Sequence, residues 1–180
     1  MWFETVTTVG PATEPVSLAD AKLHCRVDDT ASDDIIADYI EGARSQVETI
    51  TGTRLVSQTV QMRCSSFYDL DKLPVAPVSS ITSVEYTDDN GDTQTFTDFE
   101  ERLFGLRPSL KLNYNANWPS IREQSLIVVT AVVGYSTIPP VLLDAVRLGI
   151  SLRNEEREIF DPEYIAAIEA ITINHKVWSL

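Results

Sequence analysis

The stretch SDDIIADYIEGARSQVETITG, residues 32–52, determines how the rest of the chain is interpreted. Its apolar residues recur at spacings of four and three, the period of one helical face: Ile36, Ile40, Ala43, Val47 and Ile50. Charged residues are expected to cover the other faces: Asp38, Glu41, Arg44 and Glu48. Acidic residues at the start favour the helix dipole, and Gly52 stands where a left-handed residue would end the helix. The pattern predicts a helix over residues 33–51.

A shorter helix is predicted just before it, over residues 17–26. Ser17 can cap its N-terminus, and the acidic Asp20 three residues later makes the pair a relative of the capping box. Residues 1–14 contain Gly10, Pro11 and several threonines without a helical period. They are therefore expected to form an extended N-terminal arm.

After Leu55 the hydrophobic period changes from helical to two. Val56, Val60, Met62 and Cys64 alternate with polar residues, which predicts a half-buried strand. Asn90-Gly91 lies between two short apolar and threonine-rich runs and predicts a hairpin turn. Further strands are expected near residues 103–106, 110–113 and 126–133, with a loop over 115–123. Residues 55–134 are thus predicted to be a β-rich insertion.

Helical spacing returns after Pro139-Pro140, and the face of this helix over residues 139–154 is expected to carry Val141, Ala145, Leu148 and Leu152. Asp161 followed by Pro162 predicts the start of a last helix that uses Ile165, Ile168 and Ile171. The predicted fold class is α+β: an N-terminal helix pair and C-terminal helices packed together, with an inserted antiparallel β-rich segment. The main domain would span residues 15–160, followed by a C-terminal helix and tail over 161–180.

Composition narrows the classes of function. A chain of 180 residues is the size of one domain, and 14 Lys plus Arg against 27 Asp plus Glu give a net charge of −13. Tight nucleic-acid binding needs basic clusters, so DNA gripping is disfavoured. No apolar run approaches a membrane span, and no signal-peptide pattern opens the chain, so a cytoplasm-like setting is expected. Cys25 and Cys64 are expected to be buried thiols without a disulfide.

The sequence offers no pattern for catalysis, cofactor binding or a metal. His24 and His175 are far apart and have no ligand spacing around them. The acidic group at 28–34 lacks the alternating ligands, central glycine and terminal glutamate of a calcium loop, and helix capping explains it. No phosphate-binding loop or nucleophile elbow occurs. Catalytic, cofactor and metal residues are therefore predicted to be none.

Large apolar residues lie near both ends of the sequence: Trp2, Phe3, Val177, Trp178 and Leu180. Such residues are either folded back on the core or engaged with a partner, and the sequence leaves both alternatives open.

The order of these segments resembles that of head-tail connector (adaptor) proteins of tailed bacteriophages, of the gp6-like type. The resemblance rests on VSLADAKLHCRVDDTASDDIIADYIEGARSQVETITGTRLVSQTVQMR, with Leu18, Ala21, Lys22, Thr51, Gly52 and Leu55 at the matching positions. It continues in LPVAPVSSITSVEYTDDNG, in the loop NANWPSIREQ with Trp118, Pro119, Ser120 and Arg122, and in VVTAVVGYSTIPPVLLDAVRL. It covers residues 15–155 and weakens after Asn154.

This resemblance implies a non-enzymatic structural subunit of the virion neck, made in the host bacterial cytoplasm. It implies a homo-oligomeric ring, commonly of twelve copies, that docks beneath the portal protein and joins it to a stopper or tail-terminator protein. Genomic DNA would pass through the lumen without specific binding, and no membrane is involved. The candidate interface residues are Trp2, Phe3, Trp118, Arg122, Val177, Trp178 and Leu180.

Three other functions remain to be weighed. A stopper or tail-completion protein is expected to be mainly β-barrel-like, so the four predicted helices disfavour it. A small enzyme such as a hydrolase would need a pocket where His24 or His175 meets carboxylates. A small soluble binding module is the third alternative.

Overall fold

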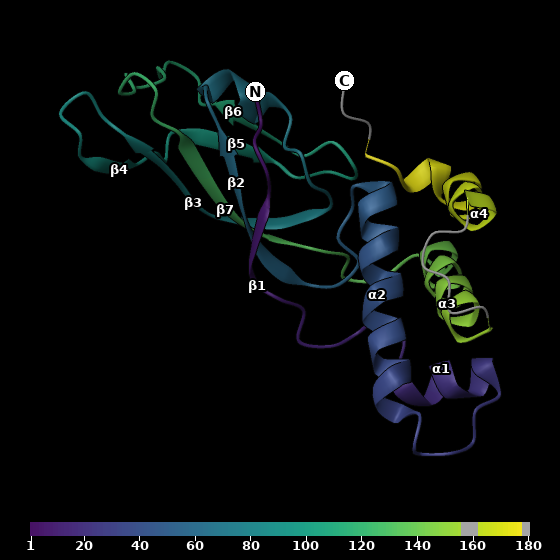
Figure 1. Ribbon diagram of the computed structural model, residues 1–180. Helices are drawn as coiled ribbons and strands as arrows, with labels where there is room; N and C mark the ends of the chain where they lie inside the picture. Colours follow the sequence, from purple (N-terminus) through teal and green to yellow (C-terminus); the bar gives the residue numbers. More distant parts are fainter. Residues whose placement is uncertain (156–161, 178–180) are drawn as a thin grey trace.

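The computed structural model describes residues 1–155 and 162–177, and they fold into two lobes (Figure 1). Strands and their connecting loops form a β lobe, and the helices form a second lobe beside it. The long helix α2 (Asp33–Thr51) reaches from the helical lobe to the junction with the strands. Apart from the edge strand β1 (Val6–Val9), which precedes the helices, the strands follow α2, and the chain returns to the helices after the last of them. The predicted α+β class with an inserted β segment is therefore confirmed.

The helical lobe contains α1 (Leu18–Cys25), α2, α3 (Pro140–Glu155) and α4 (Pro162–Thr172). Ser17 caps α1 as predicted, because its Oγ accepts a hydrogen bond of 3.1 Å from the backbone N–H of Asp20. The left-handed Gly52, with φ of 69°, ends α2 as predicted. One buried cluster holds the lobe together: Val16, Ala21, Ile36, Ile40, Ala43, Val47, Leu55, Leu142, Ala145, Val146, Ile150, Tyr164 and Ile168.

The β lobe is built on a five-stranded antiparallel sheet in the order β1-β2-β7-β3-β4. These strands are Val6–Val9, Gln58–Cys64, Ile127–Val133, Val78–Thr87 and Thr93–Thr95. The central strand β7 pairs with β2 and β3 along its whole length, and every second residue of it is buried. Val60 lies opposite Ala131 and Met62 opposite Val129, so the inward side chains of both strands share one core.

A second, two-stranded sheet of β5 (Phe99–Arg102) and β6 (Ser109–Leu112) helps to cover this core. The short 3-10 helix η1 (Phe67–Asp71) completes the cover, and a second one, η2 (Ile173–His175), follows α4. The ring of Phe67 stacks on that of Trp118, with centroids 5.0 Å apart and planes inclined by 8°. Phe96 contacts both rings.

The strand predicted near residues 103–106 is wrong, because β5 lies just before it at Phe99–Arg102. Residues 103–108 instead form the turn between β5 and β6, in which Gly105 has φ of 61°. The first strand of the insertion also begins later than predicted, at Gln58. Leu55 belongs to the helical core, so the residues between 52 and 57 make the passage from one lobe to the other. The arm is not wholly irregular, since it contains the edge strand β1.

The predicted face of α3 is also wrong in part. Its buried residues are Leu142, Ala145, Val146, Gly149, Ile150 and Arg153, whereas Leu148 is 40% exposed. The reason is Gly149, where an added Cβ would lie 3.0 Å from Cβ of Ala43. Such close helix packing places small residues at the interface. The buried face of α3 therefore cannot be predicted from the spacing of its large apolar side chains alone.

Candidate interaction surfaces

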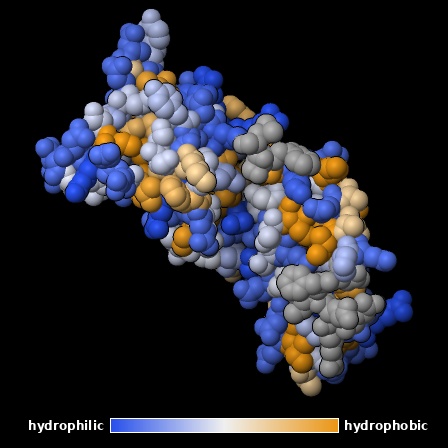
Figure 2. Space-filling view, turned by 45° about the horizontal axis from the view of Figure 1, so that its top comes forward, coloured by the Kyte–Doolittle hydropathy of each residue, from blue (hydrophilic) through white to orange (hydrophobic). Residues whose placement is uncertain are grey.

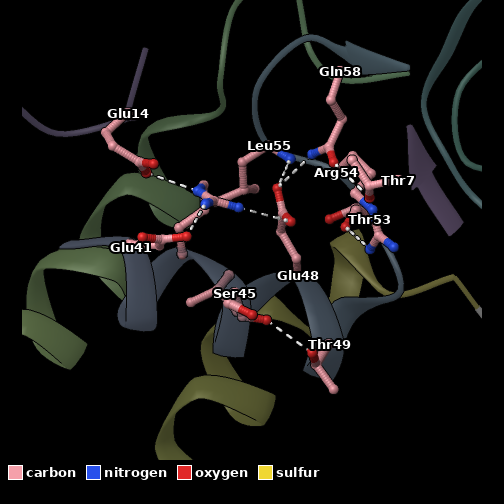
Figure 3. A network of polar contacts seen from close by, with 12 residues as sticks. Thr7, Glu14, Glu41, Ser45, Glu48, Thr49, Thr53, Arg54, Leu55 and Gln58 are labelled. Carbon is pink, nitrogen blue, oxygen red and sulfur yellow. Dashed lines mark hydrogen bonds and ion pairs between the residues drawn. The ribbon is translucent and has the colours of Figure 1, made fainter. Parts of the chain in front are cut away.

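The guanidinium of Arg44 pairs with three carboxylates, those of Glu14, Glu41 and Glu48. They belong to a polar network at the junction of the two lobes (Figure 3). Arg44 Nε donates to Glu14 Oε2 at 2.7 Å, and Nη1 donates to Glu48 Oε2 at 3.4 Å. Glu41 contributes a third carboxylate, 3.7 Å from Nη2. Arg44 and Glu48 cover a face of α2 other than the apolar one, as expected, but that face is also buried, since Arg44 is 8% exposed and Glu48 5%. A side chain on the polar side of a helix is buried here because the arm and the start of the β lobe lie over it.

The carboxylate of Glu48 connects α2 to the first residues of the β lobe. Its Oε1 accepts hydrogen bonds from the backbone N–H of Leu55 at 2.8 Å and from Nε2 of Gln58 at 3.3 Å. Burial raises the pKa of Glu48, and these donors and Arg44 offset only part of that effect. Thr7 of β1 donates to Oε1 of Gln58 at 3.3 Å, so the network also reaches the arm. The role of this network is structural: it fixes the arm and the start of the β lobe to α2.

Trp2 lies against its own chain. Its indole Nε1 donates to the backbone oxygen of Lys72 at 2.7 Å, and the ring packs on the β core. The next residue, Phe3, is 48% exposed, although its backbone N–H bonds the carbonyl of Arg63 at 2.8 Å. The two neighbours therefore differ: Trp2 anchors the arm, and the Phe3 side chain is accessible to a partner.

The two candidates in the middle of the sequence, Trp118 and Arg122, also differ in exposure. Trp118 is half-buried in the aromatic stack with Phe67 and Phe96. Arg122 is exposed, and its backbone N–H bonds the carbonyl of Thr87 at 2.9 Å beside the β3–β4 hairpin. Its guanidinium lies close to the hairpin turn, because a Cβ on Gly91 would be 3.3 Å from Arg122 Nη1. Arg122 is thus placed at the outer end of the β lobe.

A cleft of about 510 Å³ lies between the lobes, where both terminal segments meet the end of α2. Its walls include Trp2, Ile50, Leu73, Pro74 and Val177. Val177 is held there by a hydrogen bond of 2.7 Å from its backbone N–H to the carbonyl of Thr51. The remaining candidates, Trp178 and Leu180, lie outside the described residues.

Among the described residues, the most exposed aromatic side chains are not the candidates predicted from the sequence. Tyr114 is 94% exposed and Phe104 83%, both in turns that flank β6, and Tyr68 of η1 is also open to solvent. Figure 2 shows the hydrophobic side chains of the face in view in separate patches among hydrophilic ones. A signal was present, because Phe104 precedes Gly105 and Tyr114 stands between Asn113 and Asn115. An aromatic residue within such turn-forming neighbours is poorly placed for burial.

The described residues show neither a cluster of metal ligands nor a membrane-spanning helix. No group of three or more potential metal ligands occurs in residues 1–155 and 162–177. His24 lines an open hollow together with Asp20, Leu23 and Arg147. Asp20 there accepts from Ser17 Oγ at 2.7 Å, and Arg147 pairs with Asp144 at 3.1 Å. Within the same residues, no helix has both the length and the hydropathy needed to cross a membrane.

Comparison with known proteins finds a family match over part of the chain and a shared fold over nearly all of it. Residues 15–93 match the family model of phage gp6-like head-tail connector proteins. A chain in the structure of the neck of an empty gene transfer agent particle, computed with C6 symmetry, superposes with a TM-score of 0.80 at 19% identity. That alignment covers 99% of this chain and 97% of the other.

Two further structures agree with this fold. A chain in the virion of the native gene transfer agent particle has a TM-score of 0.76 at 22% identity. A chain in the neck of the native particle, computed with C12 symmetry, has a TM-score of 0.73 at 20% identity. Both alignments cover 96% of this chain and 97% of the other. No curated protein matches the sequence.

Proposed function

We propose that this chain, whose residues 15–93 match the phage gp6-like head-tail connector family, is a structural connector subunit in the neck of a phage-like particle. The observation that carries the proposal is the agreement of two independent likenesses. The family match covers α1, α2, β2 and β3, and the fold likeness to neck chains covers nearly the whole sequence. The chain would be made in the bacterial cytoplasm and built into the particle from there.

The connector works as a homo-oligomeric ring of twelve copies. Rings arise from head-to-tail contacts between two different surfaces of each copy, and the two-lobed shape offers separate surfaces for such contacts. The similar chains in gene transfer agent necks come from structures computed with C6 and C12 symmetry. A net charge of −13 suits a channel through which DNA passes, since like charges disfavour adhesion.

The ring docks on a portal protein above and on a stopper or tail-terminator protein below. The contact residues are those selected from the sequence: Trp2, Phe3, Trp118, Arg122, Val177, Trp178 and Leu180. Among the described ones, Phe3 and Arg122 have side chains accessible for direct contact. Trp2, Trp118 and Val177 support these surfaces through their contacts with the chain itself.

Negative-stain microscopy of the purified chain mixed with its portal tests this function. A ring of density at the clip end of the portal is the expected result, and a portal from an unrelated particle serves as the control. Portals that stay undecorated at micromolar concentrations of the chain would refute the connector role. A portal that is bare while a tail protein is bound would instead favour a tail-completion protein. Monomers that bind neither would favour a soluble binding module.

A further inference from the structure

The segment of residues 1–9 lies on the fold without supplying a fully buried side chain to either core. All four residues of β1 are exposed, and Val16 is the first residue of the chain that belongs to the helical core. Trp2 is the one arm side chain that packs on the β core, and it is only partly buried. Residues 1–9, the part of the arm meant from here on, can therefore leave the rest of the protein with both cores intact.

Residues 1–9 are held mainly by the edge of strand β2 and by the ion pair between the Met1 ammonium and Asp69. Val6 lies opposite Gln61 and Thr7 opposite Val60, and the register shifts between Thr7 and Val9. Phe3 N–H bonds the carbonyl of Arg63, and Trp2 bonds that of Lys72. These contacts are largely to main-chain groups of β2 and its neighbours. The identical segment of another copy could make the same contacts.

A short hinge separates this segment from a fixed point. Glu14 is tied to Arg44, and Val16 is buried, so the chain is fixed from there onward. Residues 12–14 are exposed, and Gly10 stands in open space, with nothing within 4 Å of an added Cβ. Pro11 and Pro15 keep the residues before them extended. Residues 10–13 span up to about 14 Å when fully extended.

We propose that in the assembled ring the arm crosses to the neighbouring copy and pairs with that copy's β2 edge in the place now taken by its own arm. This inference rests on the proposed ring. The bonds made after exchange are the same as those broken, so the exchange costs little in contacts. The ring holds a neighbour at a high effective concentration, which the isolated subunit lacks. Trp2 would then anchor one copy to the next while making the contacts seen within one chain.

Two chains with different single reactive cysteines can test this. One carries Val6→Cys and the other Gln61→Cys, positions that face each other across β1 and β2. Both carry Cys25→Ser, whereas Cys64 is retained because it is buried and its pKa is raised to about 11, chiefly by that burial. A disulfide that joins residues 6 and 61 can then form only between different copies. A Thr82→Cys chain, with its cysteine at an exposed site on β3, replaces the Val6→Cys chain as the collision control.

The chains are mixed in equal amounts, assembled on the portal and oxidised, and the cross-linked peptides are identified by mass spectrometry. Exchange predicts a 6–61 disulfide in up to about half of the Val6→Cys chains, because a random neighbour carries Gln61→Cys half of the time. The Thr82→Cys control should give little product. Rings that form without the 6–61 link between copies would overturn the exchange and leave the connector role intact. The absence of rings would overturn both.

Discussion

Arg44 and Glu48 lie one turn apart on α2 and form a buried ion pair of 3.4 Å at the point where arm, helical lobe and β lobe meet. Arg44→Met should lower the free energy of unfolding by about 3 to 5 kcal/mol, because it leaves Glu48 buried without its cation. Urea denaturation followed by circular dichroism measures this loss.

Glu48→Gln is the matched variant for that measurement. Glutamine keeps an oxygen that can accept from Leu55 N–H, and Arg44 keeps Glu14, so this variant should lose only about 1 to 2 kcal/mol. Equal losses in the two variants would show that the pair does not act as a joint and that the network contributes through packing alone.

The raised pKa of Glu48 predicts a particular dependence of stability on pH. Burial places the folded-state pKa above the unfolded value, so the contribution of Glu48 is fully present below the unfolded pKa and is lost as pH rises through the folded one. The stability of the wild type relative to Glu48→Gln should therefore be greater at about pH 4 than at about pH 7. Thermal unfolding of both proteins across this range measures the difference, and a difference that grows with pH would contradict it.

Asp88 provides an internal comparison of opposite sign. Hydrogen bonds, first from the backbone of Asp92 and then from Gln94, lower its pKa. Its contribution is therefore present above the unfolded pKa and is lost as pH falls through the folded one. Asp88→Asn should accordingly lose its stability difference from the wild type on acidification, in the same thermal scans.

Local patterns predicted most of the elements in this fold. The face of Ile36, Ile40, Ala43 and Val47 is buried as expected, and Ser17 and Gly52 bound their helices as predicted. These features depend on residues within one or two turns, which a single sequence displays. The connector resemblance is also confirmed, by the family match over residues 15–93.

What the sequence did not reveal depends on contacts between distant segments. Arg44 is followed on the same helical face by Glu48, which is typical of a solvated surface pair, and only the return of Glu14 and Leu55 over it makes the pair buried. The hydrophobic period of one helix or strand does not indicate which distant segment packs over its polar face.

Gly149 should be intolerant of any side chain. A Cβ there would lie 2.2 Å from the phenolic oxygen of Tyr164 and 3.0 Å from Cβ of Ala43. Gly149→Ala should therefore cost about 1 to 3 kcal/mol of stability through overpacking between α3 and its neighbours. Gly10→Ala, whose Cβ would meet nothing, is the control and should be nearly neutral.

The double variant Gly149→Ala with Tyr164→Phe identifies the clash. Removing the phenolic oxygen should restore part of the loss, which a double-mutant cycle in urea would report as a coupling energy. Additive losses in the cycle would place the strain at Ala43 instead.

The two cysteines should differ in reactivity. Cys64 is buried, and burial is the main reason why its pKa is raised to about 11, so it should stay unlabelled by a thiol reagent at about pH 8 until the protein unfolds. Cys25 is only partly buried and should react first. Labelling kinetics with mass detection measure both rates. Equally fast labelling of both thiols in the native protein would show that the sheet edge at Cys64 opens readily.

Substitutions at Trp118 and Phe104 should have different effects, the first on folding stability and the second on assembly. The half-buried Trp118 stacks on Phe67 at the β core, so Trp118→Ala should destabilise the protein by about 1 to 3 kcal/mol. Phe104 is 83% exposed, and Phe104→Ser should leave the urea midpoint nearly unchanged. If this aromatic turn contacts a neighbouring copy or the portal, Phe104→Ser should weaken decoration of the portal about tenfold or more, as truncation of an aromatic interface anchor does. Decoration that equals the wild type would exclude the turn from the interface, and Tyr114→Ser then tests the loop beyond β6 by the same titration.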